Sequence, residues 1–319
     1  DQVRDLASST MSPTAVLFSG MPYAFRLSAP SLMANLVETN DADVFVLIPR
    51  DSAVKRAASC WPPGGGPPRL DLDETGAAPP GWLSLVQGTA RVPTTISAGD
   101  VQFLRDTFGS RLREIRVADE IPGYADSLRT CRRRVATAVR QYRRDGGVMA
   151  EPSEDGDEYR AMSDQYHHVH GAYELMRQEE ERSGRRYGRV VRARLDFFCD
   201  APLVLADCGD ERLRVFGCFR QYYDAVDAGD EFCWYSARGV AERLFQNLWR
   251  LGTILDARYQ TVDQRSGHDH RFDPEVQYSI LLRELGLEVA RIRIFRSARY
   301  TDGEDGYYYH NYLFQRMDL

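Results

Sequence analysis

The chain has 319 residues, with 41 basic and 47 acidic side chains, a formal net charge of -6 and 43% hydrophobic residues. A chain of this length can bury a substantial core. Its acidic balance argues against a general nucleic-acid binder, because such proteins are usually basic. No apolar run approaches the roughly 20 residues of a membrane-spanning helix. We therefore expect no nucleic-acid partner and no membrane span.

Six cysteines are present, and none of them forms a CxxC pair. In a chain of this size we interpret them as mostly reduced core residues rather than as a disulfide framework. This interpretation favours the cytoplasm, although the compartment stays unassigned. The first residues do not form a signal peptide, and an anchor trimmed from this sequence is left open.

The first 50 residues predict a strand, a helix and a second strand. The strands are residues 15–18 and 44–48, both short apolar runs. The helix covers residues 28–40, with Ser28 as its N-cap and Pro30 in its first turn. This order favours parallel strand pairing with a right-handed crossover.

The middle of the chain predicts an insertion followed by further elements. Residues 60–82 are rich in proline and glycine, so we expect an irregular surface insertion there rather than a domain linker. Residues 111–120 then predict a strand, residues 126–147 a basic helix and residues 150–159 a mobile acidic loop. Apolar residues recur at helical spacing over residues 163–188, which predicts a long amphipathic helix.

The last third predicts more strands and a final helix. Strands are expected within residues 187–203, 212–219 and 227–255, the last of which continues into a helix. A final helix begins at Pro274 after Asp273, ends at Gly286 and leads into a last strand. Since no repeat or clear boundary is visible, we expect residues 1–319 to form one α/β domain, with a mostly parallel central sheet flanked by helices.

Three charged residues alternate along the strand predicted within residues 187–203. Arg192, Arg194 and Asp196 would share one face of it, because side chains alternate along a strand. They form either a structural salt bridge or a site for an anionic ligand, with or without a metal. Asp196 lies near the strand's end, where a carboxylate can hold a divalent cation and, through it, a diphosphate. Asp200 is placed to assist.

The turn SGMPYAFR after the first strand is a second candidate ligand site, because α/β sheets bind ligands beyond the carboxyl ends of their strands. It contains Gly20 and Met21 but matches neither GxGxxG nor GxxxxGK[ST]. Arg26 is either a bidentate phosphate donor or an exposed arginine at the start of a helix.

Histidines offer weaker candidates. His167 and His170 are neighbours at i, i+3, which suits a metal pair or a packed helix face, but no HExxH pattern accompanies them. His268, His270 and His310 can each reach a site from a loop. No GxSxG nucleophile elbow occurs.

An acidic turn is expected just before the apolar strand within residues 227–255. This turn has three carboxylates within five residues, namely Asp227, Asp230 and Glu231. These like charges repel one another unless a cationic or hydroxyl-rich partner is present. The turn is either solvated surface or presents a carboxylate to a sugar or an acceptor.

The order of these segments resembles the GT-A-fold glycosyltransferases that use nucleotide-sugar donors, in a subgroup with members in bacteria, algae and large viruses. The resemblance covers residues 15 to about 295. It rests on the segments LFSGMPYAFR, DADVFVLI, DQYHHVHGAYELM, YGRVVRARLDFF, GDEFCWYSARGVAERL and PEVQYSILLRELGLEV.

The resemblance implies a Rossmann-like GT-A domain that moves a sugar to a hydroxyl of a carbohydrate or glycoconjugate acceptor. The nucleotide would lie against residues 20–26, with Asp196 beside the diphosphate. The family's Asp-x-Asp metal motif reads LDF here, so only Asp196 matches it. Mn²⁺ or Mg²⁺ is the implied metal, and His310 is the candidate that completes its ligands, with His270 behind it.

The same resemblance implies roles in the reaction. Arg192, Arg194 or a metal would neutralise the leaving nucleoside diphosphate. Asp230 and Glu231 are the first candidates for deprotonating the acceptor hydroxyl. Glu275 is the next, although its place in a helix's first turn also suits dipole stabilisation. A metal-dependent phosphoesterase or other hydrolase and a non-catalytic nucleotide- or carbohydrate-binding relative remain as alternatives.

Overall fold

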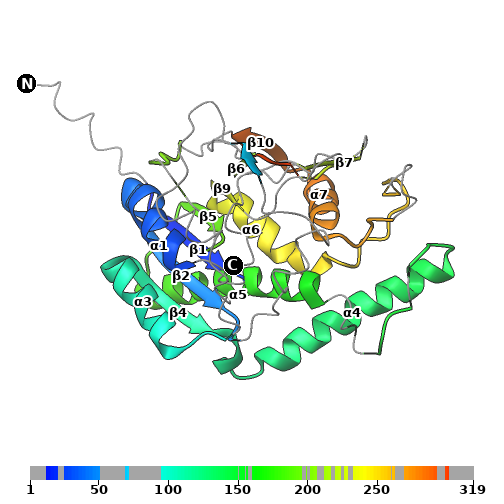
Figure 1. Cartoon of the computed structure of the whole chain (residues 1–319), viewed down its shortest axis with the longest axis horizontal. Helices are drawn as coiled ribbons and strands as arrows, with labels where there is room; N and C mark the ends of the chain where they lie inside the picture. The colour runs from blue at the N-terminus through cyan, green and yellow to red at the C-terminus, as the bar shows by residue number, and fades with distance from the viewer. Residues whose placement is uncertain are drawn as a thin grey trace, which may run out of the picture.

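A computed structural model of the chain describes residues 12–20, 25–50, 69–71, 95–149, 151–154, 156, 160–195, 199, 202–206, 212–216, 220–223, 226–228, 233–259, 261–262, 269–292 and 299–301. Helices cover both faces of a central sheet (Figure 1). The described residues form this sheet from seven strands in the order β10-β6-β9-β5-β1-β2-β4, and of these only β9 runs antiparallel to its neighbours. The mixed α/β class with a mostly parallel sheet is therefore confirmed.

The central sheet contains β1 (Thr14–Ser19), β2 (Asp43–Ile48), β4 (Leu112–Val117), β5 (Arg189–Ala193), β6 (Arg212–Phe216), β9 (Trp234–Ala237) and β10 (Glu288–Ile292). Two smaller antiparallel pairs join β3 (Arg69–Asp71) to β11 (Arg299–Thr301) and β7 (Arg220–Tyr223) to β8 (Val226–Ala228). The α-helices are α1 (Phe25–Leu32), α3 (Ala98–Phe108), α4 (Tyr124–Arg144), α5 (Arg160–Ser183), α6 (Arg238–Asn247) and α7 (Pro274–Glu284). Shorter helical segments are η1 (Met33–Val37), η2 (Glu38–Asn40), η4 (Gly109–Arg111), η5 (Ala118–Glu120) and η7 (Leu248–Arg250).

The sheet separates two hydrophobic cores. Side chains of α1 and α3 pack on one face, whereas those of α4, α5, α6 and α7 pack on the other. Every residue of β1 and β2 is buried, as expected for parallel strands that helices cover on both sides. This explains why their sequences are continuously apolar rather than alternating.

The strands predicted at residues 15–18, at residues 44–48 and within residues 187–203 are present and lie side by side. β1 pairs in parallel with β2 on one side and with β5 on the other. Strand β5 is shorter than the predicted run, because it ends at Ala193 and Leu195 already lies in a turn.

The helix after β1 differs from its prediction. It begins at Phe25, so Ser28 lies within α1 and is not the N-cap; its hydroxyl donates to the carbonyl of Leu195 instead. Pro30 lies inside α1, and the chain continues as the π-helix η1 and the 3₁₀-helix η2. Proline lacks the N–H of a regular helix interior, which fits this departure from α geometry.

The final helix begins and ends as predicted. Pro274 takes the first position of α7 and Gly286 follows its end with φ of 62°. Asp273 occupies the N-cap position, but its carboxylate contacts His270 Nδ1 at 2.5 Å rather than a helix N–H.

Two short strands lie where irregular chain was expected. Arg69–Asp71, the only described part of the insertion predicted at 60–82, forms β3. Asp227 belongs to β8 and not to an acidic turn. Neither strand has a sequence pattern long enough to be distinguished from a loop.

Among the described helices, none combines the length and the apolar character needed to cross a bilayer.

Candidate functional site

The strand order defines one place in the sheet where the chain reverses its direction of winding. From β1 the chain passes through α1 to β2 on one side, and β5 later pairs with the other side of β1. In open α/β sheets, ligands bind beyond the carboxyl ends of the strands at such a switch point. Here those ends are Ser19, the last residue of β1, with Gly20 after it, and Arg194 and Leu195 after β5. We call this region the switch-point edge.

Arg192 is a buried cation at this edge. It lies beside Leu17 in the parallel pairing, and its side chain is 1% exposed. Its Nη2 atom donates to Ser19 Oγ at 3.4 Å, which links the ends of β5 and β1. Arg194 follows β5 at the same end and is partly exposed. A guanidinium group keeps its charge inside a protein, so β5 carries permanent positive charge to the switch-point edge.

Gly20 ends β1 in a conformation that favours glycine. Its φ is 101°, whereas a side chain added there would meet no atom within 4 Å. The requirement for glycine is therefore the backbone conformation and not crowding. The turn leaves open space at the switch-point edge. Met21, its neighbour in the predicted site, lies outside the described residues.

The backbone that follows β5 is tied to α1 and η1. Ser28 holds the carbonyl of Leu195, and Asn35 Nδ2 donates to the carbonyl of Cys199 at 2.6 Å. The amide of Cys199 in turn donates to Ser31 Oγ at 3.2 Å. Asp196 itself lies outside the described residues, but the chain is fixed on both sides of it. Its predicted role as a diphosphate or metal ligand stays a prediction.

Arg26, in the first turn of α1, is oriented by neighbouring side chains. Its Nε and Nη2 atoms donate to Asp100 Oδ1 at 3.1 and 2.6 Å, and its guanidinium carbon lies 4.8 Å from the ring centroid of Phe103. Burial would raise the pKa of Asp100, but hydrogen bonds from Ser97 and Arg26 outweigh it and lower that pKa. Because Asp100 already occupies one edge of the guanidinium, a phosphate would have to bind through the remaining N–H groups.

The antiparallel strand β9 begins at the same edge. Trp234, its first residue, pairs with Arg192, and both side chains are 1% exposed. The chain therefore enters β9 where β5 ends. Asp230 and Glu231 precede β9 closely in sequence but lie outside the described residues, so their predicted catalytic roles are untested. Glu275 lies in the first turn of α7, where only its backbone is described.

Of the three histidines of α5, His168 is buried and His167 is partly buried, whereas the side chain of His170 is 43% exposed. Burial lowers the pKa of His167 and of His168 to about 4 in each case. Their rings lie 4.6 and 5.8 Å from the ring of Tyr124, between α4 and α5. Within the described ranges, no group of three or more His, Cys, Asp or Glu side chains is placed to hold a metal. His310 and His268 lie outside these ranges.

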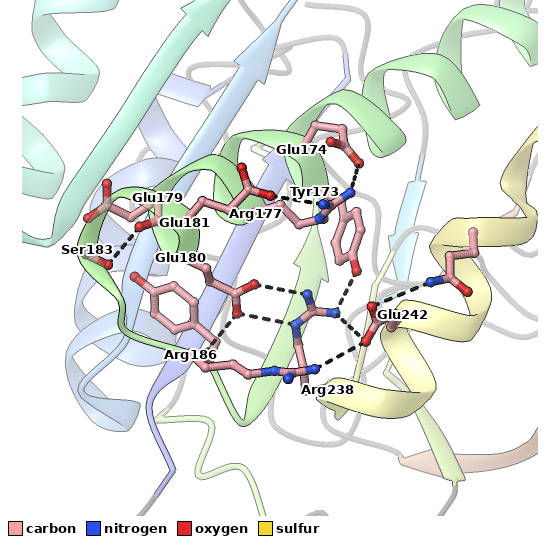
Figure 2. Close-up of polar contacts among 12 residues, drawn as sticks. Tyr173, Glu174, Arg177, Glu179, Glu180, Glu181, Ser183, Arg186, Arg238 and Glu242 are labelled. Atoms are coloured by element: carbon pink, nitrogen blue, oxygen red, sulfur yellow. Dashed lines mark hydrogen bonds and ion pairs between the residues drawn. The ribbon is translucent and has the colours of Figure 1, made fainter.

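A second polar cluster lies at the opposite edge of the sheet, and sequence reasoning missed it. Arg238 contacts Glu180, Tyr173 and Glu242 (Figure 2). The backbone amide of Arg238 donates to the carbonyl of Gly188, just before β5, which places the cluster at the amino ends of the strands. The residues that join α5 to α6 are more than 50 positions apart in the sequence, so no local sequence pattern predicts their contacts. The charged groups of this cluster pair with one another, which indicates a structural role for the cluster.

Asp43 forms a similar structural cluster at the start of β2. Its carboxylate is 1% exposed and accepts from Arg185 Nη1 and Tyr187 Oη, both at 2.8 Å. Arg113 Nη2 lies 2.8 Å from its other oxygen. Three donors satisfy this buried carboxylate, as its burial requires.

Fold and site together define a class of protein: an open α/β sheet with helices on both faces and a cationic switch-point edge. In comparisons with known proteins, no family model, no curated protein and no solved structure matches the chain.

Proposed function

We propose that the chain is a GT-A-type glycosyltransferase that moves a sugar from a nucleotide-sugar donor to a hydroxyl of a carbohydrate or glycoconjugate acceptor. The observation that carries this proposal is the adjacency of Gly20, Arg192 and Arg194 at the switch point between β1 and β5. Doubly wound sheets bind nucleotides at this position. Arginine also suits phosphate groups, because its planar fork matches their oxygens.

In this proposal the donor's nucleotide lies along Gly20, Met21 and Arg26, and its diphosphate lies near Arg192 and Arg194. Breaking the bond to the sugar leaves negative charge on the nucleoside diphosphate. Fixed cations at that point stabilise the transition state, since they need no rearrangement as charge develops. The burial of Arg192 on a central strand supplies such a fixed cation.

The acceptor hydroxyl must lose a proton as it attacks the sugar, and a nearby carboxylate is the natural base. Asp230 and Glu231 are the first candidates, because they closely precede the strand that starts opposite Arg192. Glu275, in the first turn of α7, is the next candidate.

A divalent metal, Mn²⁺ or Mg²⁺, enters the proposal only through Asp196 and His310. If bound there, it would add positive charge beside the diphosphate. The described side chains at the switch-point edge are arginines rather than carboxylates, so they fit direct neutralisation by guanidinium groups. No step of the proposed reaction depends on the metal.

A thermal-shift screen of UDP-, GDP- and dTDP-sugars, with and without Mn²⁺, tests the donor site. A ligand at about 100 times its Kd adds roughly 2.7 kcal/mol to the stability of the folded state. We expect one nucleotide class to raise the melting temperature and Arg194→Gln to remove most of that rise. Arg116→Gln, at an exposed arginine of β4, is the matched control and should leave the rise unchanged.

Release of nucleoside diphosphate, measured with mixed carbohydrate acceptors, tests the transfer step. Nucleotide binding without any such release would identify a non-catalytic binding protein. If no nucleotide or nucleotide sugar changes the melting temperature, the proposed donor site is wrong.

A further inference from the structure

Arg192 on β5 and Trp234 on β9 lie directly opposite each other in the antiparallel pairing of these two strands. Directly paired residues project from the same face of a sheet. That face is the one covered by α5, because Trp234 and Val190, which lies two residues before Arg192 on β5, both belong to the core on the α5 side. A permanent cation and an indole ring are therefore neighbours on one face of the central sheet.

The guanidinium group of Arg192 leans toward the switch-point edge. Arg192 pairs with Leu17 of β1 in the strand register, but its Nη2 atom donates to Ser19 Oγ at 3.4 Å. Ser19 lies two residues beyond Leu17 and is the last residue of β1. The side chain thus extends along the sheet toward the carboxyl ends of the strands, where open α/β sheets bind their ligands.

The indole N–H of Trp234 is buried and has no acceptor within the described structure. Buried N–H groups are almost always hydrogen bonded, so this exception indicates a missing partner. The indole nitrogen can only donate, and the missing partner is therefore an acceptor. The nearest aromatic ring, that of Phe245, has its centroid 5.6 Å from that of Trp234, and an aromatic ring is a weak acceptor.

The position beside Arg192 selects the kind of acceptor. Arginine keeps its positive charge inside a protein, and a cation in a site of low dielectric attracts a negatively charged acceptor more strongly than a neutral one. The indole is also held in place, because Phe245 packs against it and stacks on Tyr173 with a centroid distance of 4.0 Å. A fixed donor loses little freedom when its acceptor binds. An oxygen of a phosphate group meets all of these requirements.

We propose that Trp234 Nε1 and the guanidinium group of Arg192 together bind one phosphate group of the nucleotide-sugar donor. This inference rests on the proposed function, and it adds Trp234 to the residues that contact the diphosphate. The phosphate lies on the α5 face of the switch-point edge, beside Ser19 and the open space at Gly20. A nucleoside without phosphate groups supplies no anionic oxygen to the indole N–H.

The indole N–H resonance of Trp234, measured by NMR on the ¹⁵N-labelled full chain, tests this contact. The chain has four tryptophans, so replacing each of the other three with phenylalanine assigns the resonance by elimination. UDP, GDP or dTDP, whichever raises the melting temperature most, should move the resonance downfield, because a new hydrogen bond deshields the proton. Inorganic pyrophosphate should move it in the same direction. The corresponding nucleoside should leave it in place.

Trp234→Phe removes the N–H and keeps an aromatic ring. The variant should bind the same nucleoside diphosphate about tenfold more weakly in calorimetric titrations, since a hydrogen bond to a charged group contributes about that factor. Without ligand it should melt no lower than the parent chain, because an unsatisfied buried N–H is lost. Trp249→Phe is the matched control: Trp249 is 58% exposed and lies against Arg134 of α4. It should keep the parent's affinity.

The inference is overturned if neither a nucleoside diphosphate nor pyrophosphate moves the Trp234 resonance, if the nucleoside alone moves it as far, or if Trp234→Phe binds as tightly as the parent. In these cases a rise in melting temperature with a nucleotide would still support the donor site, so the two proposals fail separately. A shift with pyrophosphate, when no nucleotide or nucleotide sugar raises the melting temperature, would support the phosphate site and contradict the proposed donor.

Discussion

Arg238 donates from Nε and Nη2 to the two carboxylate oxygens of Glu180, at 3.3 and 3.0 Å, across the boundary between α6 and α5. Both side chains are largely buried, at 9% and 12% exposure. Tyr173 Oη accepts a further hydrogen bond from Arg238 Nη1 at 2.6 Å. A pair of this kind fixes how two helices meet, because a charge buried without its partner is costly.

Glu180→Ala should therefore destabilise the fold by about 3–5 kcal/mol, since it leaves the Arg238 guanidinium buried without its main partner. Urea unfolding followed by circular dichroism measures this loss. Arg186→Ala is the control: Arg186 is 73% exposed and its ion pair with Glu242 spans 3.5 Å, so about 0–1 kcal/mol is expected. Equal effects of the two substitutions would contradict a structural role for the buried pair.

Tyr124→Phe should stabilise the fold. The Tyr124 hydroxyl is buried and has no hydrogen-bond partner in the described structure, which costs about 1–3 kcal/mol. Phenylalanine removes that cost and keeps the ring beside His167. Tyr166→Phe is the matched control, since the Tyr166 hydroxyl donates to the carbonyl of Pro274 and its loss should destabilise. A lower melting temperature for Tyr124→Phe would show that the hydroxyl has a stabilising contact.

Stability should fall as the pH drops from about 6.5 to about 4. Burial lowers the pKa of His168 in the folded state to about 4, whereas the unfolded chain titrates near 6.5. The folded state binds the proton less well than the unfolded chain does. The contribution of His168 to the stability of the folded state is therefore complete above pH 6.5 and is lost as the pH falls from about 6.5 to about 4. The loss amounts to about 3 kcal/mol for His168 alone.

Urea midpoints at pH 7.5 and 4.5 measure this dependence. His168→Phe should reduce the difference between the two midpoints, with the remainder due to His167, whose pKa burial also lowers to about 4. An unchanged difference in the variant would mean that other groups cause the acid sensitivity.

Asp196→Ala should abolish sugar transfer and leave the melting temperature nearly unchanged, because the proposed role of Asp196 lies with the diphosphate. If Asp196 instead pairs with a buried arginine, the substitution strands that charge and costs about 3–5 kcal/mol. Calorimetry together with a nucleotide-release assay distinguishes these outcomes. A large drop in stability would support the structural alternative.

Asp230→Asn and Glu231→Gln test the acceptor side. At least one of them should lower turnover strongly and leave nucleotide binding nearly intact, since the donor is held by other residues. Turnover and nucleotide titration on the same preparations give both readouts. Near-normal turnover in both variants would exclude these two residues as the catalytic base and direct attention to Glu275.

The central strands and most of their flanking helices could be predicted, because helices bury β1 and β2 on both faces and their sequences are therefore almost continuously apolar. β5 could be recognised from its paired valines, although it also contains Arg189 and Arg192. Alternation predicted that Arg192, Arg194 and Asp196 share one face of a strand, but β5 ends at Ala193, so of these three residues Arg192 lies within it, Arg194 follows it and Asp196 is outside the described residues. The start of α1 could not be predicted, since Ser28 resembles an N-cap but satisfies the carbonyl of Leu195. That contact joins distant parts of the chain and leaves no local pattern.

The candidate site was predictable only in outline. Sequence order alone places Gly20 and Arg194 after apolar strands, but only the strand order shows that their strands are neighbours. Arg26 was predicted to be either a bidentate phosphate donor or an exposed arginine at the start of a helix, and its pairing with Asp100 on α3 had no sequence signal. Charged pairs between separate elements depend on packing, which a single sequence does not display.

The position of β9 has a consequence for the order of assembly. β9 lies between β5 and β6, yet β6 precedes it in the chain. During synthesis β6 therefore emerges before the only strand that connects it to the growing sheet, and its other neighbour, β10, is made later still. Two of the seven described strands, β6 and β10, therefore join the sheet through this one antiparallel strand. Such non-local closure is slow, and it leaves the edge of β5 unpaired until Trp234 and the residues after it have left the ribosome.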